Sequence, residues 1–147
     1  MEILDSFKSR HDELLLMIGE LRVMLKPEQL QVRPNAKTAH EHLCSLGEKL
    51  KRHLTEEDRG VYPPLLTQDN PKLKSLAWGF ISGEKPLRKQ FEAYYQKWLK
   101  DCDFNFTELF LEETLELFAA IESRIDREQS VLLPKLEESG VFSGAVS

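Results

Sequence analysis

Residues 50–66 read LKRHLTEEDRGVYPPLL, and residues 121–137 read IESRIDREQSVLLPKLE. The two stretches align without gaps, so that Glu57 matches Glu128 and a proline follows six residues later in both. Leucine and isoleucine recur around these glutamates at three- and four-residue steps, which is the period of a helix with one buried face. The repeat therefore predicts two helices that present the same turn to a common interior.

Apolar residues follow a helical period along four stretches of the chain, and no useful length of it alternates as a strand would. Four amphipathic segments joined by short connectors predict an all-α fold, an antiparallel up-down-up-down four-helix bundle. We expect one domain over residues 1–140 and a frayed tail over residues 141–147. The four apolar stretches are residues 3–25, 43–61, 73–98 and 110–132.

Proline, asparagine and glycine predict where these helices begin and end. Residues 26–35 are expected to form a linker, because Pro27 cannot continue the first helix. Asn70 is a favoured N-cap, and a proline follows it at the first helical position. Gly140 is a suitable stop for the last helix. Glycine and proline interrupt the third stretch, so we expect a kink or local break near residues 83–86.

The charge and hydropathy of the chain exclude several classes of partner. Its 147 residues carry a formal net charge of -5, whereas binding to nucleic acid phosphates needs a basic face. The same charge argues against an anionic membrane surface. The apolar patch at residues 14–19 is too short to span a bilayer, and acidic residues precede it. We expect a cytoplasmic protein without a nucleic acid or membrane partner.

Ionisable residues interrupt the apolar stripe of every predicted helix. Their three- and four-residue spacing places them on the same faces as the leucines and phenylalanines. A buried charge without a partner is strongly penalised, so these groups either converge on one site or reach solvent through a shifted stripe. Because all four helices contribute, we expect a shared site. Its candidate residues are His11, His53, Glu57, Glu84, Arg124 and Glu128.

The pattern of these residues resembles the hemerythrin-like (HHE cation-binding) domain. The features are a histidine on the first helix, H-x-x-x-E before an aromatic-Pro step on the second, and a matching turn before Leu-Pro on the fourth. The resemblance covers residues 5–137. It implies the hemerythrin fold and a non-haem iron pair inside the bundle. Carried over by position, it implies that His11, His53, Glu57 and Glu128 are metal ligands.

Two positions depart from the pattern of that family, so the ligand set is degenerate. Where the family usually has a histidine on the third helix, this chain reads EKPLR, and Glu84 is the best match. Where the family has a histidine on the fourth helix, this chain has Arg124. Arginine offers only donors and cannot ligate a metal. It suits a carboxylate instead, and Glu57 and Glu128 are the nearest candidates.

Charge distinguishes two forms of this interior. Three inward glutamates carry -3 and Arg124 adds +1, so one divalent cation brings the sum to zero. A single ion would then rest on His11, His53 and Glu57, a two-histidine, one-carboxylate set that suits iron and also zinc or manganese. In the alternative form the interior is metal-free, and Arg124 replaces the metal charge by bridging Glu57 and Glu128.

Three functions fit these expectations. The first is a metal-binding domain that binds or senses oxygen, nitric oxide, iron or redox state. The second is a metal-free module of the same fold that serves regulation or binds a protein partner. An oxidase or peroxidase ranks last, because catalysis needs an open coordination position and a nearby acid or base, and neither is evident.

Overall fold

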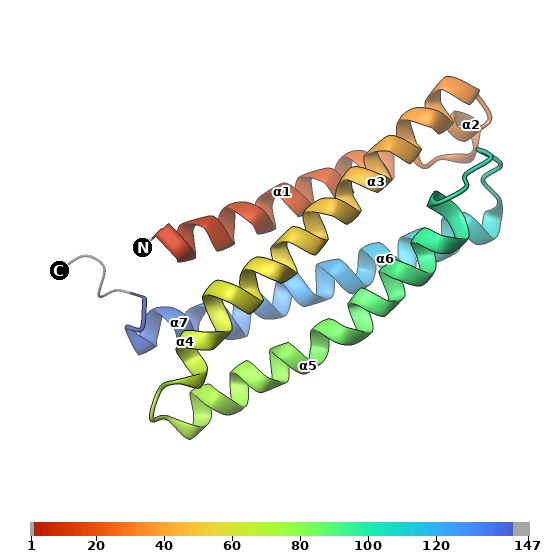
Figure 1. The fold of residues 1–147 in the computed structure, drawn as a ribbon. Coiled ribbons are helices and arrows are strands. Elements are labelled where there is room, and N and C mark those ends of the chain that lie inside the picture. Colours follow the sequence, from red (N-terminus) through yellow and green to blue (C-terminus); the bar gives the residue numbers. More distant parts are fainter. Residues whose placement is uncertain (1, 143–147) are drawn as a thin grey trace.

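The computed structural model describes residues 2–142, and nearly all of them are helical (Figure 1). No strand occurs within this range, which confirms the all-α prediction. The long α-helices are α1 (Glu2–Met24), α3 (Arg33–Glu56), α5 (Pro71–Tyr94) and α6 (Glu108–Arg127). The short ones are α2 (Pro27–Leu30), α4 (Tyr62–Leu66) and α7 (Leu133–Ser139). Three π-helical turns are η1 (Glu57–Val61), η2 (Tyr95–Leu99) and η3 (Glu128–Leu132).

The four long helices lie alongside one another in Figure 1. The connection from α1 to α3 and the connection from α5 to α6 lie at one end, and the turn between α4 and α5 lies at the other. Helix α1 packs mainly on α3, and α6 contacts both α5 and α1. Among residues 2–142, none of the helices combines the length and apolar character that a bilayer-spanning helix needs.

The predicted helix boundaries are partly confirmed. The Asn70 side chain accepts hydrogen bonds from the backbone N–H groups of Lys72 and Leu73, as expected of an N-cap. The linker prediction was wrong, because α2 lies within residues 26–35 and α3 already begins at Arg33. Each of these helices carries a proline in its first turn, where the missing N–H is not needed. Helix α5 runs without interruption through Pro86, so the local break expected near residues 83–86 is absent, whereas the alternative of a kink there stays a prediction.

The end of the last helix is defined by a glycine. Gly140 has φ 71, in the left-handed region that glycine adopts without strain, which confirms it as the stop of α7. Phe142 lies two residues after Gly140 and is only 8% exposed. The predicted frayed tail otherwise falls on residues 143–147, which lie outside the described residues. The domain boundary at residue 140 therefore stays a prediction.

The repeated stretches of the sequence form the same local structure. In each, the glutamate that begins the π-helical turn accepts a hydrogen bond at its backbone carbonyl from the N–H five residues later. Tyr62 donates to Glu57, and Leu133 donates to Glu128. A proline comes next in both stretches and has no N–H to donate. The wider π-helical turn accommodates this missing donor, and such turns are frequent at functional sites. Each glutamate therefore lies at the start of a π-helical turn.

Two apolar cores lie on either side of a buried polar layer. On α1, Phe7 belongs to one core and Leu14 to the other, and His11 lies between them. On the other three long segments, a buried glutamate lies between residues of the two cores, whereas His53 and Arg124 each lie between two residues of the core that contains Leu14. The six residues of this polar layer are His11, His53, Glu57, Glu84, Arg124 and Glu128.

Candidate metal centre

All six residues of the polar layer are buried. His11, Glu57 and Glu128 are completely shielded, and Glu84 is the most accessible with 5% exposed. Such burial requires that each charge meet a partner of opposite sign or a bound cation. The contacts between them therefore decide what the layer can hold.

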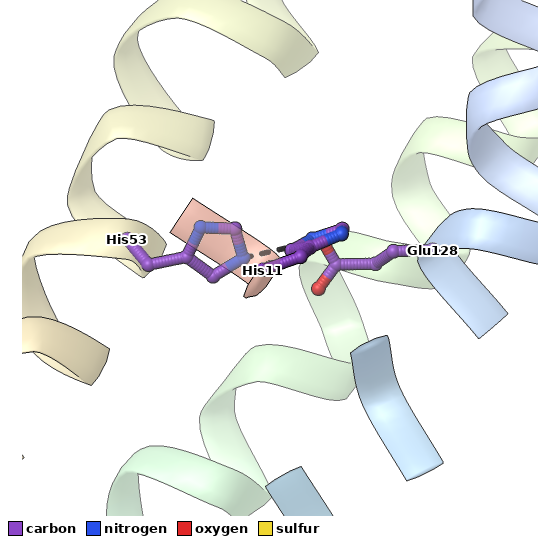
Figure 2. A group of neighbouring side chains, drawn as sticks. All are labelled: His11, His53 and Glu128. Carbon is purple, nitrogen blue, oxygen red and sulfur yellow. Dashed lines mark hydrogen bonds and ion pairs between the residues drawn. The ribbon is translucent and has the colours of Figure 1, made fainter. Parts of the chain in front are cut away.

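Two imidazoles meet one carboxylate oxygen at the centre of the layer. His11 Nε2 lies 3.1 Å from Glu128 Oε2, and His53 Nε2 lies 3.3 Å from the same oxygen. Figure 2 shows the two rings directed toward Glu128 from different helical segments. Ligand atoms of these three residues all lie within 4.8 Å of one another. They come from α1, α3 and η3, so only the folded chain assembles them.

These distances fit a shared metal ion. Ligand atoms bound at about 2.1 Å to one ion lie about 3.0–3.4 Å apart at octahedral or tetrahedral angles. His53 Nε2 also lies 3.0 Å from Glu57 Oε1, yet that oxygen has no aligned hydrogen-bond donor. Glu128 Oε1 and His11 Nδ1 are likewise buried without a hydrogen bond. Glu84 Oε1 and the donor Arg124 Nε lack an aligned partner as well, so the layer holds carboxylate oxygens that a bound cation would satisfy.

The cluster of His11, His53 and Glu128 differs in one residue from the ligand set expected from the sequence for a single ion. Glu128 joins the two histidines, whereas Glu57 was expected in that place. The Tyr62 hydroxyl donates a hydrogen bond of 2.6 Å to Glu57 Oε2, and Arg124 Nη2 lies 3.5 Å from the same oxygen. These two partners hold Glu57 toward the far side of the layer, although it still reaches His53.

Arg124 points into the layer and occupies the side opposite the histidines. Its Nε lies 3.1 Å from Glu128 Oε1, and its Nη2 approaches Glu57 as described above. Nη1 donates to the Phe80 carbonyl at 3.0 Å, and Nη2 donates to the Tyr62 hydroxyl at 2.6 Å. The guanidinium therefore links the glutamates of both repeated turns.

Glu84 does not join the histidines. Its nearest cations are Arg124 Nη2 at 3.8 Å and Arg88 Nη2 at 4.0 Å. Burial, together with hydrogen bonding to Asp58, raises the pKa of Glu84 to about 8. Its carboxyl group thus extends the network on the arginine side, away from the group of three possible ligands.

Two members of the site were missed by sequence reasoning. Tyr62 bridges Glu57 and Arg124, and Arg10 Nε donates to His53 Nδ1 at 3.2 Å. The position of Tyr62, five residues after Glu57 and directly before a proline, was the available signal for the first. The sequence held no signal for Arg10, because its contact with His53 forms only when α1 packs against α3.

Opposing effects act on the pKa values of His53 and Glu128. Burial lowers the pKa of His53, but Glu128 and Glu57 outweigh burial and raise it to about 9. Burial favours the neutral form of Glu128, but the two histidines outweigh it and hold the pKa of that carboxyl below its ordinary value. Arg10 works against the imidazolium form of His53, because its donor needs an unprotonated Nδ1. That contact selects a proton on Nε2.

The comparison with protein families agrees with this geometry. The family model for the hemerythrin HHE cation binding domain matches residues 2–136. The chain belongs to this family. Domains of the hemerythrin family bind metal ions, typically iron, so the buried cluster lies in a cation-binding fold. Among curated proteins and among solved structures, nothing matches the chain.

Proposed function

We propose that this hemerythrin domain, an antiparallel up-down-up-down four-helix bundle, binds one divalent metal ion and uses it to bind or sense a small ligand or redox state. Iron is the first candidate, and zinc or manganese suit the same donors. The ion would rest on His11, His53 and Glu128, with Glu57 as a further donor. The observation that carries this is the convergence of both imidazole Nε2 atoms on Glu128 Oε2.

Arg124 is the reason to propose one ion rather than two. Its guanidinium lies 3.1 Å from Glu128 Oε1 and 3.5 Å from Glu57 Oε2, on the side that a second ion would need. A metal about 5 Å from a guanidinium is repelled by about 3 kcal/mol per unit of metal charge at an effective dielectric near 20. Arg124 therefore supplies the second positive charge of the interior.

The surrounding side chains would orient the ligands and exclude water. The Phe7 ring lies 4.3 Å from the His11 ring and 5.8 Å from the His53 ring, centroid to centroid. Tyr62 and Arg124 fix Glu57, and Arg124 also fixes the outer oxygen of Glu128. A bound iron ion would supply reversible ligand binding or a change of oxidation state. Such a change would alter the charge beside Arg124, which links the two repeated turns.

A second candidate function is a metal-free module for regulation or protein interaction. The observation that favours it is the Arg10 hydrogen bond to His53 Nδ1, which keeps the proton on Nε2, where a metal would bind. Arg124 would then be the cation of the layer, and both histidines would serve as hydrogen-bond donors to Glu128. In this form the layer would hold the two turns together without an ion.

Anaerobic Fe(II) loading of the full chain, followed by elemental analysis, separates these functions. We expect one iron per chain, with loss of iron in His11→Gln and in Glu128→Gln. His42→Gln is the matched control, since His42 Nδ1 bonds the Thr38 carbonyl oxygen within α3, away from the layer. Two irons per chain would contradict the single-ion site. No iron in the parent would contradict metal binding and favour the metal-free module.

A further inference from the structure

A groove of about 670 Å³ lies between α5 and the C-terminal part of the α6–η3 segment. This volume is in the range of roughly 300–1,000 Å³ that is typical of small-molecule sites. Leu76 and Phe80 line one wall, and Val131, which is 46% exposed, lines the other. Apolar side chains thus form much of the surface of an open depression.

The charged residues that line this groove are all basic. Lys72, Arg124 and Arg127 line it, and no acidic residue does. Within residues 2–142, neither Lys72 nor Arg127 takes part in an ion pair, although the chain as a whole is acidic. Lys72 also lies in the first turn of α5, where the helix dipole is positive. The groove is therefore a local cationic surface on a protein of net charge -5.

Missing side chains on α5 open the floor of the groove to Arg124. Gly79 and Gly83 are one turn apart on the same helix face. A Cβ atom at Gly79 would meet no atom within 4 Å, so this position borders open space. A Cβ at Gly83 would lie 3.2 Å from Arg124 Nη1. The guanidinium that completes the polar layer is thus reached from the groove.

We propose that this groove binds a small carboxylate with an apolar body, of the fatty-acid class. The carboxylate would pair with Arg127 and Lys72 and approach Arg124 Nη1, while the apolar body would cover Leu76, Phe80 and Val131. Charge complementarity selects this occupant, because a neutral apolar molecule leaves the cations unused and a cation is repelled. Binding in the groove does not require a metal ion in the polar layer, although Arg124 belongs to both sites.

Calorimetric titration of the full chain with octanoate, in the presence of EDTA, tests this site. We expect octanoate to bind at least about tenfold more tightly than 1-octanol or octyltrimethylammonium, a difference that calorimetry resolves. Amide chemical shifts should change at Ser75, Gly79 and Gly83. Because EDTA removes metal, failure of the metal proposal does not affect this measurement.

Two glycine variants provide a blocked groove and a matched control. Gly79→Leu fills the groove without a clash at Cβ, whereas Gly19→Leu adds the same side chain to α1, where a Cβ also meets nothing within 4 Å. Both variants should unfold no earlier than the parent, since leucine favours helix over glycine. We expect Gly79→Leu to lose octanoate binding and Gly19→Leu to retain it. Arg127→Gln should weaken binding about two- to fivefold, as expected for one exposed ion pair.

Several results would overturn the assignment. Parental octanoate affinity in Gly79→Leu would place binding elsewhere on the molecule. Equal affinity for 1-octanol would show that the cations do not select the ligand. Absence of octanoate binding at millimolar concentration would exclude the ligand class. Binding of an acidic helical peptide in the groove, without octanoate binding, would replace the small carboxylate with a protein partner.

Discussion

The turns at Glu57–Val61 and Glu128–Leu132 have the same backbone, with a buried glutamate at the start of a π-helical turn and a proline just after it. Their side chains differ. His53 lies 3.0 Å from Glu57 in the first turn, and Arg124 lies 3.1 Å from Glu128 in the second, each one helical turn before its glutamate. The residue one helical turn before the glutamate is thus a possible metal ligand in one copy, His53, and a permanent cation in the other, Arg124. The backbone fixes where a carboxylate points, and the residue four positions earlier fixes which positive charge it meets.

The largest expected effect comes from making the two turns alike. Arg124→His removes the guanidinium and places an imidazole at the matching position of the second turn. We expect iron content to rise from one to two per chain after anaerobic loading and oxidation, with a stronger visible charge-transfer band. Elemental analysis and absorption spectra measure both. Unchanged iron content would mean that Arg124 does not exclude the second ion.

Removing the cation without replacing it should strongly destabilise the metal-free protein. Arg124→Leu leaves Glu57, Glu84 and Glu128 without their buried partner, which costs about 3–5 kcal/mol. Urea unfolding in EDTA measures the free energy of unfolding. Arg22→Leu is the control, because its contact with Glu122 is partly solvent-exposed, lies outside the polar layer and is worth about 0–1 kcal/mol. Equal losses in both variants would contradict a buried charge role for Arg124.

Tyr62 is a further residue that contacts the polar layer in one copy only, since Leu133 occupies the matching position in the other. Tyr62→Phe removes a hydroxyl that donates to Glu57 and accepts from Arg124. We expect a loss of about 1.5–3 kcal/mol, as for hydrogen bonds to charged groups. The matched control is Tyr94→Phe, where the buried hydroxyl bonds only the neutral Thr114, and the loss should be about 0.5–1.5 kcal/mol. Thermal or urea unfolding distinguishes the two, and the reverse order would be inconsistent with a charged bridge.

The smallest effect concerns the first turn alone. Arg10→Met removes the donor to His53 Nδ1, so the neutral imidazole can carry its proton there and leave Nε2 free for a metal. We expect metal affinity to rise about tenfold, the lower end of effects from residues that orient a ligand. Competition with a chelator measures this change. Arg59→Met is the control, because Arg59 lines the same surface pocket as Arg10. A weaker affinity in Arg10→Met would show that Arg10 supports the ligand instead.

The helical period of the sequence predicted much of the fold and the composition of the polar layer. Each of the six ionisable residues placed on an apolar stripe, from His11 to Glu128, is buried, because spacing of three and four residues fixes the face of a helix. The linker prediction was wrong, and so was the local break expected near residues 83–86. Proline does not end these helices, because it is tolerated in the first turns of α2 and α3, and Pro86 lies within α5.

The sequence by itself determined which residues enter the interior, that two turns share a pattern, and that one of them carries arginine in place of histidine. Only the tertiary structure decided that Glu128, rather than Glu57, meets both histidines, and that Tyr62 and Arg10 hold the layer from either side. Helical spacing fixes the direction of a side chain from its own axis. It does not fix which atoms of four different segments come within 3–4 Å, because that depends on how the segments pack and which partners compete for each oxygen.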